Sequence, residues 1–473
     1  MSPQPHVAVI GGGVAGLAAA RRLAAGCRVT VLESSPRFGG KLAPLSLEGV
    51  RLDAGAESFL ARRPEAVDLV HELGFGVMVV HPTAEKPRVL IGGRPVRVPP
   101  SLLGVPTDLA ALAVVLSDEG YARAADEPRR EWGPLPDDIA IGAVVDDHFG
   151  AEVTDRVLEP MLGGVYAGRS RELSFAAVAP DLFERARAGG SLLHHARAAA
   201  RSDQDGPVFA GLAGGVSRLV DALVQELRRH GATLRSGATV RSLRRRTGGG
   251  FELAVGAAGE GASGTAAAVE VDAVVLATPA HAFARLLSEA VPAAAEWADV
   301  PYASVAVVTL VVRDVRTEGS GLLVPPGVLP TIKAVTHSSA KWAWVAEAAQ
   351  RRWGPGVSVV RASVGRVGEE ALLQLPDEAL LQRTYAEAQE LPGWSRSHLV
   401  TGHVSRWGGG LPQYLVGHRQ RVARLRATLA AEPGIAICGA ALDGVGIAAC
   451  VASANRAAEK IESELAGWPE GTE

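Results

Sequence analysis

Three glycines near the start of the chain have the spacing of a nucleotide-binding turn. Gly11, Gly13 and Gly16 follow the short apolar run His6–Ile10 and open the Ala- and Leu-rich segment Val14–Ala25. In such a turn the first glycine allows a tight bend, the second lets the backbone approach a pyrophosphate, and the third lets the helix pack on the strand. The free N–H groups and the positive dipole end of the helix would then hold the phosphates.

An acidic residue stands where this kind of site needs one. Glu33 follows a second apolar run, Arg28–Leu32, and lies 20 residues after Gly13, the position from which a carboxylate binds ribose hydroxyls. Strand, glycine turn, helix, second strand and acid together predict a βαβ unit with a parallel sheet that binds a dinucleotide. The alternative, a glycine-rich turn that binds nothing, explains the glycines but not the acid.

Two later stretches repeat the α/β pattern. Apolar residues recur at helical spacing between Val216 and Leu227, and Gly231 follows where a glycine commonly ends a helix. The segment 434–465 predicts a strand, a glycine-rich turn and a long Ala-rich helix. Short apolar runs predict three further strands, at 233–234, 239–243 and 269–277.

Composition narrows the function classes. The net charge of −3, from 48 basic and 51 acidic residues in a chain of 473, argues against a nucleic-acid-binding protein. No apolar run reaches the ~18–20 residues that span a membrane, and the residues before His6 are too few and too polar for a signal peptide. Three cysteines without a CxxC pair favour a reducing compartment, the cytoplasm. His194 and His195 have no third ligand at suitable spacing, so we predict no metal.

Motifs along nearly the whole chain resemble those of the flavin-containing amine oxidase superfamily and, within it, the porphyrinogen oxidases. The superfamily motifs are Gly11–Gly16, Arg37–Lys41, Asp53–Ser58 and Asp443–Ile447. The motifs that resemble porphyrinogen oxidases, most of all the actinobacterial enzymes that act on coproporphyrinogen III, are Ala56–Arg62, Glu159–Pro160, Gly164–Gly168, Lys341–Trp342, Trp407, Leu411–Tyr414 and Leu442–Cys450.

The resemblance implies an α/β fold of the p-hydroxybenzoate-hydroxylase type. A Rossmann-like FAD-binding domain would be discontinuous in sequence, at residues 1–82, 205–290 and 421–473. A helical domain would occupy residues 83–204, and a mixed β substrate-binding domain residues 291–420. The three α/β pieces found from the sequence pattern agree with this layout.

The resemblance also assigns a non-covalent FAD site, because neither Cys438 nor Cys450 fits a flavin-attachment motif. The glycine turn would hold the pyrophosphate, Glu33 and Ser34 the ribose, and the backbone of Val240 the adenine. The expected cofactor-binding residues are Gly11, Gly12, Gly13, Val14, Ala15, Gly16, Glu33, Ser34, Gly40, Lys41, Gly55, Ala56, Glu57, Ser58, Val240, Trp407, Val445, Gly446 and Ile447.

The implied reaction is the oxidation of coproporphyrinogen III to coproporphyrin III in haem biosynthesis, with molecular oxygen as acceptor and hydrogen peroxide as product. Protoporphyrinogen IX is the alternative substrate. Arg88, Lys333 and Gly164 are the expected substrate-binding residues: Arg88 matches a carboxylate-binding arginine of the family, whereas Lys333 is chosen for its charge and position. No sequence element identifies a general base, so no catalytic residue is assigned.

Two more distant functions remain open. One is another flavoenzyme of the superfamily, such as an amine oxidase or a carotenoid desaturase. The other is a binding protein without catalysis, like the Rab GDP-dissociation inhibitors, which the intact glycines and Glu33 argue against. The apolar segment Pro100–Leu116 predicts packing over the active-site mouth, and peripheral membrane docking is the alternative.

Overall fold

A five-stranded parallel sheet forms the centre of the α/β domain in the computed structural model, which describes residues 4–202, 206–259 and 266–466. Each neighbouring pair of strands is parallel. Four of the strands are almost wholly buried, as expected for apolar strands covered on both faces. In spatial order the strands are β12 (Thr233–Arg235), β2 (Arg28–Leu32), β1 (His6–Ile10), β16 (Ala273–Leu276) and β22 (Ile435–Ile437).

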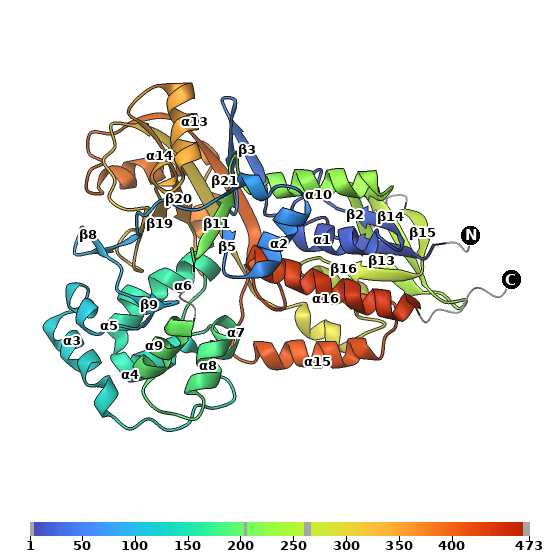
Figure 1. Cartoon of the computed structure of the whole chain (residues 1–473), viewed down its shortest axis with the longest axis horizontal. Helices are drawn as coiled ribbons and strands as arrows, with labels where there is room; N and C mark the ends of the chain where they lie inside the picture. The colour runs from blue at the N-terminus through green and yellow to red at the C-terminus, as the bar shows by residue number, and fades with distance from the viewer. Residues whose placement is uncertain (1–3, 203–205, 260–265, 467–473) are drawn as a thin grey trace.

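Different layers cover the two faces of this sheet. One face packs against four helices (Figure 1): α1 (Val14–Leu23), α2 (Pro64–Glu72), α10 (Arg218–Arg229) and α16 (Ile447–Ala466). The other packs against two helices and an antiparallel sheet: α11 (Ala280–Leu287), α15 (His418–Ala430), β13 (Ala238–Arg245), β14 (Phe251–Ala257) and β15 (Ala266–Val271). The start, middle and end of the chain thus assemble into one mixed α/β domain.

A second, seven-stranded sheet lies beside this domain. Its strands in spatial order are β21 (His398–Pro412), β17 (Tyr302–Arg313), β20 (Val357–Val364), β19 (Ile332–Thr336), β18 (Gly321–Leu323), β7 (Arg88–Ile91) and β8 (Arg94–Arg97). From the sequence we expect residues 88–97 to lie in the helical domain, but the structure places them in this sheet. They belong to the sheet because β7 pairs in parallel with β18, with Arg88 opposite Leu322.

The two faces of the seven-stranded sheet differ in burial. One is a closed apolar core that includes α14 (Asp377–Gln389). The other packs at one end against α13 (Ala343–Trp353), β3 (Pro44–Leu47) and β4 (Val50–Asp53). Further along, this second face is only half-buried, at residues we call the open row: Val305, Val307, Ala334 and Ser363. Ser363 pairs with both Val307 and Ala334, so these side chains point to the same side.

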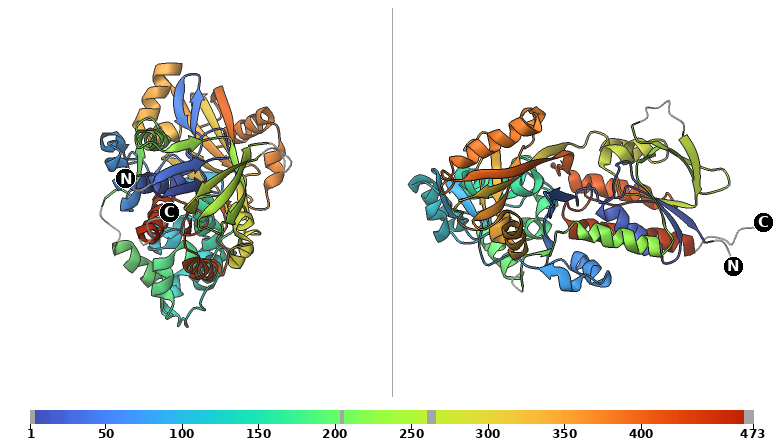
Figure 2. Two further views of the ribbon diagram at one scale, coloured as in Figure 1. Left: turned by 90° about the vertical axis from the view of Figure 1, so that its right-hand side faces the viewer. Right: turned by 90° about the horizontal axis from the view of Figure 1, so that it is seen from above.

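Helices dominate the part of the chain between β8 and β11. They share one core and lie, with the seven-stranded sheet, at one end of the α/β domain (Figure 2). The helices are α3 (Asp118–Ala125), α4 (Ile141–Phe149), α5 (Ala151–Val153), α6 (Glu159–Tyr166), α7 (Phe175–Val178), α8 (Pro180–Ala186) and α9 (Leu192–Ser202). Shorter elements connect these layers: β5 (Phe59–Leu60), β6 (Val79–Val80), β11 (Phe209–Leu212) and α12 (Ser338–Lys341). The expected boundary between residues 204 and 205 lies outside the described residues.

The apolar segment Pro100–Leu116 packs mainly against the protein itself. It forms β9 (Ser101–Leu102), β10 (Val105–Pro106) and a 3-10 turn. Val105, Leu112 and Val115 are buried in the core of the helical part, while Val114 is exposed. Across the described ranges, no helix combines the length and apolar character needed to cross a membrane.

Candidate functional site

The turn between β1 and α1 needs glycine at two positions because a side chain would clash with backbone. Gly11 has φ +108° and donates its N–H to the Leu32 carbonyl over 2.8 Å. A Cβ on Gly11 would lie 2.5 Å from the Ala277 carbonyl oxygen, and a Cβ on Gly16 would overlap the Gly11 carbonyl oxygen. These two glycines therefore let strand and helix pack together.

Packing within the protein does not require glycine at position 13, because a Cβ there would meet nothing within 4 Å. It immediately precedes α1, which begins at Val14, and no side chain caps this end of the helix. The first N–H groups of a helix have no partner within it. The open space at Gly13 therefore lies where the N–H groups of Val14, Ala15 and Gly16 can bind an anion.

Glu33, which follows β2, already has part of its carboxylate engaged. One oxygen accepts the Gly12 N–H over 2.7 Å and the other accepts the Ser35 N–H over 2.7 Å. A carboxylate has about four acceptor positions, so two remain for hydroxyl groups of a ligand. Ser34, the other residue expected at the ribose, is exposed.

Val240, the residue expected at the adenine, is brought to the same end of the sheet by β13. The Ala238 N–H at the start of this strand donates to the Glu33 carbonyl over 2.8 Å. Val240 itself is buried, and its carbonyl accepts the Arg285 guanidinium over 3.1 Å. A contact to adenine would therefore share this carbonyl with Arg285.

The loop that carries Gly40 and Lys41 lies against the glycine turn. Gly39 donates its N–H to the Gly12 carbonyl over 2.7 Å, and a Cβ on Gly40 would lie 3.3 Å from the Gly13 Cα. Lys41 is exposed, yet burial among protein atoms lowers the pKa of its ammonium. Protein atoms therefore surround much of this side chain, and we call the space beside it, next to the Gly13 turn, the recess.

Gly55 and Trp407 meet at this recess although they come from different domains. A Cβ on Gly55 would overlap the Lys41 carbonyl oxygen and lie 3.0 Å from the Trp407 ring. The Trp407 indole N–H donates to the Ala54 carbonyl over 3.3 Å. Ala56, Glu57 and Ser58 continue the same loop and are half-buried.

The carboxylate of Glu57 is occupied by two cations of the seven-stranded sheet region. It binds the Lys341 ammonium at 2.7 Å and the Arg361 guanidinium at 2.8 Å, with only 14% of its side chain exposed. Burial alone would raise the pKa of Glu57, but the two cations outweigh it and hold the pKa at about 2. Most acceptor positions of this carboxylate are therefore used within the protein.

Arg361 is a site residue that our sequence analysis missed. Its guanidinium also donates to the Gly55 carbonyl, so it ties β20 to the loop at the recess. The feature of the sequence that could have identified it is a single arginine within the apolar run Val357–Val364.

The C-terminal glycine turn also leads to the vicinity of Lys41. Val445, Gly446 and Ile447 lead into α16, and a Cβ on Gly446 would meet nothing within 4 Å. Cys450, in the first turn of α16, lies close enough to Lys41 for its charge to affect the Cys450 pKa. The N-termini of α1 and α16 therefore both open on the space next to Lys41, which fits a dinucleotide with a flavin at one end.

The three expected substrate residues lie on different elements. Arg88 of β7 is 3.7 Å from Glu318, a loose ion pair, and its side chain is 31% exposed. Gly164 lies in α6, is exposed and has open space around it. Lys333 of β19 is 5% exposed, and burial, reinforced by Arg366, lowers its pKa to about 7.

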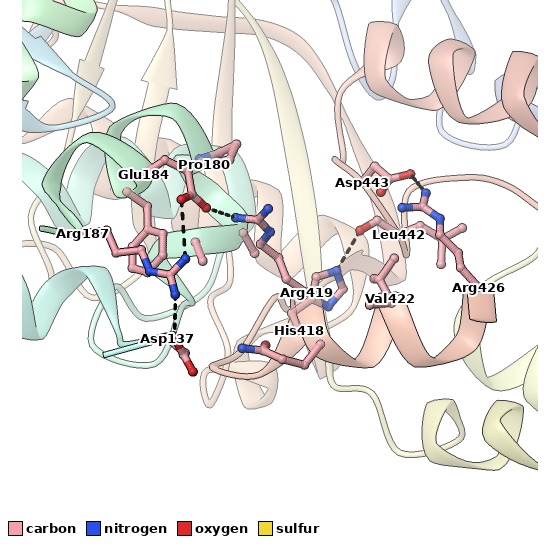
Figure 3. A pocket seen from close by; sticks show the side chains of 15 residues that line it. Asp137, Pro180, Glu184, Arg187, His418, Arg419, Val422, Arg426, Leu442 and Asp443 are labelled. Carbon is pink, nitrogen blue, oxygen red and sulfur yellow. Dashed lines mark hydrogen bonds and ion pairs between the residues drawn. The ribbon is translucent and has the colours of Figure 1, made fainter. Parts of the chain in front are cut away.

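A cavity of about 660 Å³ lies away from these residues, between α8 and α15. Its labelled charged side chains pair with one another, and His418 donates to the Leu442 carbonyl over 2.8 Å (Figure 3). The ion pairs are Arg187 with Asp137, Arg419 with Glu184, and Arg426 with Asp443. We assign it no role in the cofactor site. No cluster of three or more potential metal-ligating side chains occurs within residues 4–202, 206–259 and 266–466.

Comparison with known proteins agrees with this geometry. A family model described as flavin containing amine oxidoreductase matches residues 14–462. The coproporphyrinogen III oxidase of Mycobacterium tuberculosis is 34% identical, covering 98% of this chain and 99% of the relative. That of Propionibacterium freudenreichii is 33% identical over 98% and 92%. A crystal structure from Exiguobacterium sp. 255-15 superposes with a TM-score of 0.83 at 29% identity, over 98% of this chain and 100% of the other. The chain therefore belongs to the flavin-containing amine oxidoreductase family, in the group that includes the bacterial coproporphyrinogen III oxidases.

Proposed function

We propose that this protein oxidises coproporphyrinogen III to coproporphyrin III in haem biosynthesis, with molecular oxygen as the electron acceptor and hydrogen peroxide as the product. The observation that carries the proposal is the near full-length similarity, at 33–34% identity, to actinobacterial proteins named for this substrate. Three successive two-electron steps convert the porphyrinogen to the porphyrin. Each removes two hydrogens, and the same electrons and protons convert one oxygen molecule to one peroxide.

The chain contributes binding and orientation to this reaction. When bound, FAD supplies the two-electron acceptor. The N-terminus of α1, beside Gly13, would hold the pyrophosphate and Glu33 the ribose. The N-terminus of α16, at Gly446, brings the positive end of a helix dipole, which stabilises negative charge. Trp407 is where the seven-stranded sheet meets the cofactor loop, so the open row is the surface that would orient the substrate.

Non-covalent binding of FAD is supported by the state of the cysteines. Cys450 lies near the C-terminal glycine turn, with its sulfur 3.9 Å from the Gly444 carbonyl oxygen. Burial raises the pKa of Cys450 to about 11 and that of Cys438 beyond the normal range. Neither thiol is therefore a nucleophilic thiolate at neutral pH.

The reaction is tested by mixing the purified yellow protein with coproporphyrinogen III without oxygen. We expect the flavin absorbance to bleach, and to return when oxygen is admitted as peroxide accumulates. Acid precipitation should release the flavin as free FAD. A flavin that stays oxidised with the porphyrinogen would remove the proposal, and a colourless protein would favour the binding-protein alternative.

We prefer coproporphyrinogen III, with four propionates, over protoporphyrinogen IX, with two, because the actinobacterial relatives at 33–34% identity are named for coproporphyrinogen III. The human protoporphyrinogen oxidase is also similar but at 28% identity, over 96% of this chain and 98% of the relative. Equal kcat/KM values for the two porphyrinogens would remove the basis of this preference.

Replacing Arg88 with Ala is expected to raise KM for coproporphyrinogen III roughly tenfold, or ~1.4 kcal/mol, the scale of one charge-assisted hydrogen bond. Its partner Glu318 provides the control, because Glu318→Gln removes the only charge paired with Arg88 among the described residues. We expect that variant to keep or lower KM. If Arg88→Ala leaves KM unchanged, the arginine serves only as a surface ion pair.

We also propose that the protein acts in the cytoplasm with at most peripheral membrane contact. The support is the packing of Val105, Leu112 and Val115 into the helical core. Recovery in the supernatant after fractionation at low salt is the expected result.

A further inference from the structure

Lys333 is a buried lysine in an unusual backbone position. On β19, Ile332 pairs with Val364 and Ala334 pairs with Ser363, so Lys333 is the extra residue of a β-bulge. Bulges commonly redirect a side chain next to a functional site. Its ammonium makes no hydrogen bond or ion pair with any described residue, which is costly for a charged group at 5% exposure.

A second buried cation, Arg366, lies beside Lys333. Both contact the backbone of Val324: its N–H donates to the Lys333 carbonyl over 3.1 Å, and its carbonyl accepts the Arg366 guanidinium over 2.9 Å. Arg366 is 4% exposed, and its Nε is enclosed without a hydrogen-bond partner. Two neighbouring buried cations thus both have unused donors.

The nearby acids neutralise this pair only in part. Glu369 forms a loose ion pair with Arg366 at 3.7 Å through one oxygen, while its other oxygen accepts a bond from Arg169 at 3.2 Å. Glu159, which also attracts Arg366, accepts the Ser170 N–H over 2.7 Å. With Arg169, the cluster therefore has three basic and two acidic side chains, so the acids do not balance all the basic groups.

The cation pair lies beneath the helix that carries an expected substrate residue. α6 packs against β18 and β19, and a Cβ on Gly163 would lie 3.9 Å from the Arg366 Nε. The next residue, Gly164, is exposed and unobstructed. Ala334, directly after Lys333, belongs to the open row. A ligand on the open row would therefore come next to both cations.

We propose that Lys333 and Arg366 together bind one carboxylate of the substrate, as a buried two-cation site between α6 and β19. The inference rests on the proposed function, because the bound carboxylate would be a propionate of the porphyrinogen substrate. A carboxylate would accept the unused N–H donors of both residues and neutralise one buried charge. This subsite is separate from Arg88, which is on β7 and paired with Glu318.

The test compares an acid with its ester. We would measure the dissociation constants of coproporphyrin III and of its tetramethyl ester by porphyrin fluorescence, using holoprotein with Lys333→Met, Arg366→Met and both changes. Each single variant should weaken binding of the acid tenfold or more, and the double variant should weaken it little further, since both residues hold one group. Binding of the ester should not change. Arg351→Met, at an arginine 71% exposed on α13, is the matched control.

A second measurement is the uptake of a proton by the protein when the ligand binds. Burial lowers the Lys333 pKa to about 7 in the ligand-free protein, so at about pH 8 this lysine is mostly neutral. A bound carboxylate favours the charged form, and the wild-type protein should take up a proton on binding. Calorimetry in two buffers of different ionisation enthalpy measures this uptake, which Lys333→Met should abolish.

The outcomes separate the two proposals. Turnover of coproporphyrinogen III by the wild type, with equal acid affinity in all variants, would overturn the carboxylate site and leave the proposed function intact. An equal loss of affinity for acid and ester would show a structural defect and also overturn it. A wild type that neither turns over the porphyrinogen nor binds the porphyrin would overturn both. Because Lys333→Met removes an unpaired buried charge, we expect the ligand-free variant to melt no lower than the wild type.

Discussion

Gly13→Ala should yield a well-folded protein that has lost most of its flavin, whereas Gly16→Ala should strongly destabilise the domain. The two glycines belong to one turn but face different surroundings. A methyl group at position 13 meets no protein atom, so its cost to folding is about 1 kcal/mol, as for a changed helix cap. It instead fills the space where a pyrophosphate would approach the N-terminus of α1. We expect cofactor affinity to fall on the order of a hundredfold, or ~2.7 kcal/mol.

The same methyl group at position 16 would overlap the Gly11 carbonyl oxygen. Relief requires α1 to move off β1, with an expected cost of about 3 kcal/mol or more from overpacking. Melting temperatures of both apoproteins and the flavin-to-protein absorbance ratio measure the two effects separately. If Gly13→Ala retains full flavin occupancy at low micromolar concentration, the space beside it does not hold the phosphates.

Glu57→Gln should destabilise the protein by about 3–5 kcal/mol, because it leaves Lys341 and Arg361 buried without their common anion. The substitution preserves the size of the side chain, so the effect is electrostatic. Thermal or denaturant unfolding of the apoprotein measures it. Glu347→Gln is the control, since this glutamate is 68% exposed and its ion pair with Arg351 is long, at 3.6 Å. We expect that change to have little effect on stability.

The ion pairs of Glu57 with Lys341 and Arg361 also predict how the stability of the protein depends on pH. The pKa of Glu57 falls from its ordinary 4.5 to about 2 in the folded protein. The unfolded chain therefore takes up a proton first, and the contribution of Glu57 is full above pH 4.5 and lost as pH falls towards 2. The wild type should lose stability in this window more steeply than Glu57→Gln. Parallel pH profiles would show that Glu57 is not paired in the folded state.

The local parts of the candidate site were predictable because their determinants are consecutive in sequence. The turn at Gly11–Gly16, the acid at Glu33 and the cap at Gly231, which has φ +76°, each depend on a few neighbouring residues. The structure brings the expected residues of the glycine turn, the Lys41 loop and the C-terminal turn to one recess. Their contacts to a cofactor stay a prediction.

The features that sequence reasoning missed depend on pairing between distant segments. Nothing near Arg88 indicates that β7 joins a strand more than 200 residues later, at Leu322. The expected strand at 269–277 is in fact the end of β15 and the whole of β16, separated at Asp272, whose carboxylate accepts the His6 N–H over 2.6 Å. The bulge at Lys333 likewise exists only because β20 is its neighbour.

The order of the strands in the central sheet also constrains how the protein is made. β1 (His6–Ile10) is translated long before β22 (Ile435–Ile437) and α16 (Ile447–Ala466). Translation at ~5–20 residues per second therefore leaves the glycine turn without its final partners for roughly 20–90 seconds. The strands of the seven-stranded sheet are all synthesised earlier, because β21 is the last of them along the chain. If α16 contributes to the cofactor site as proposed, tight flavin binding is expected only after its synthesis, and a chain truncated before Ile447 is expected to retain flavin poorly.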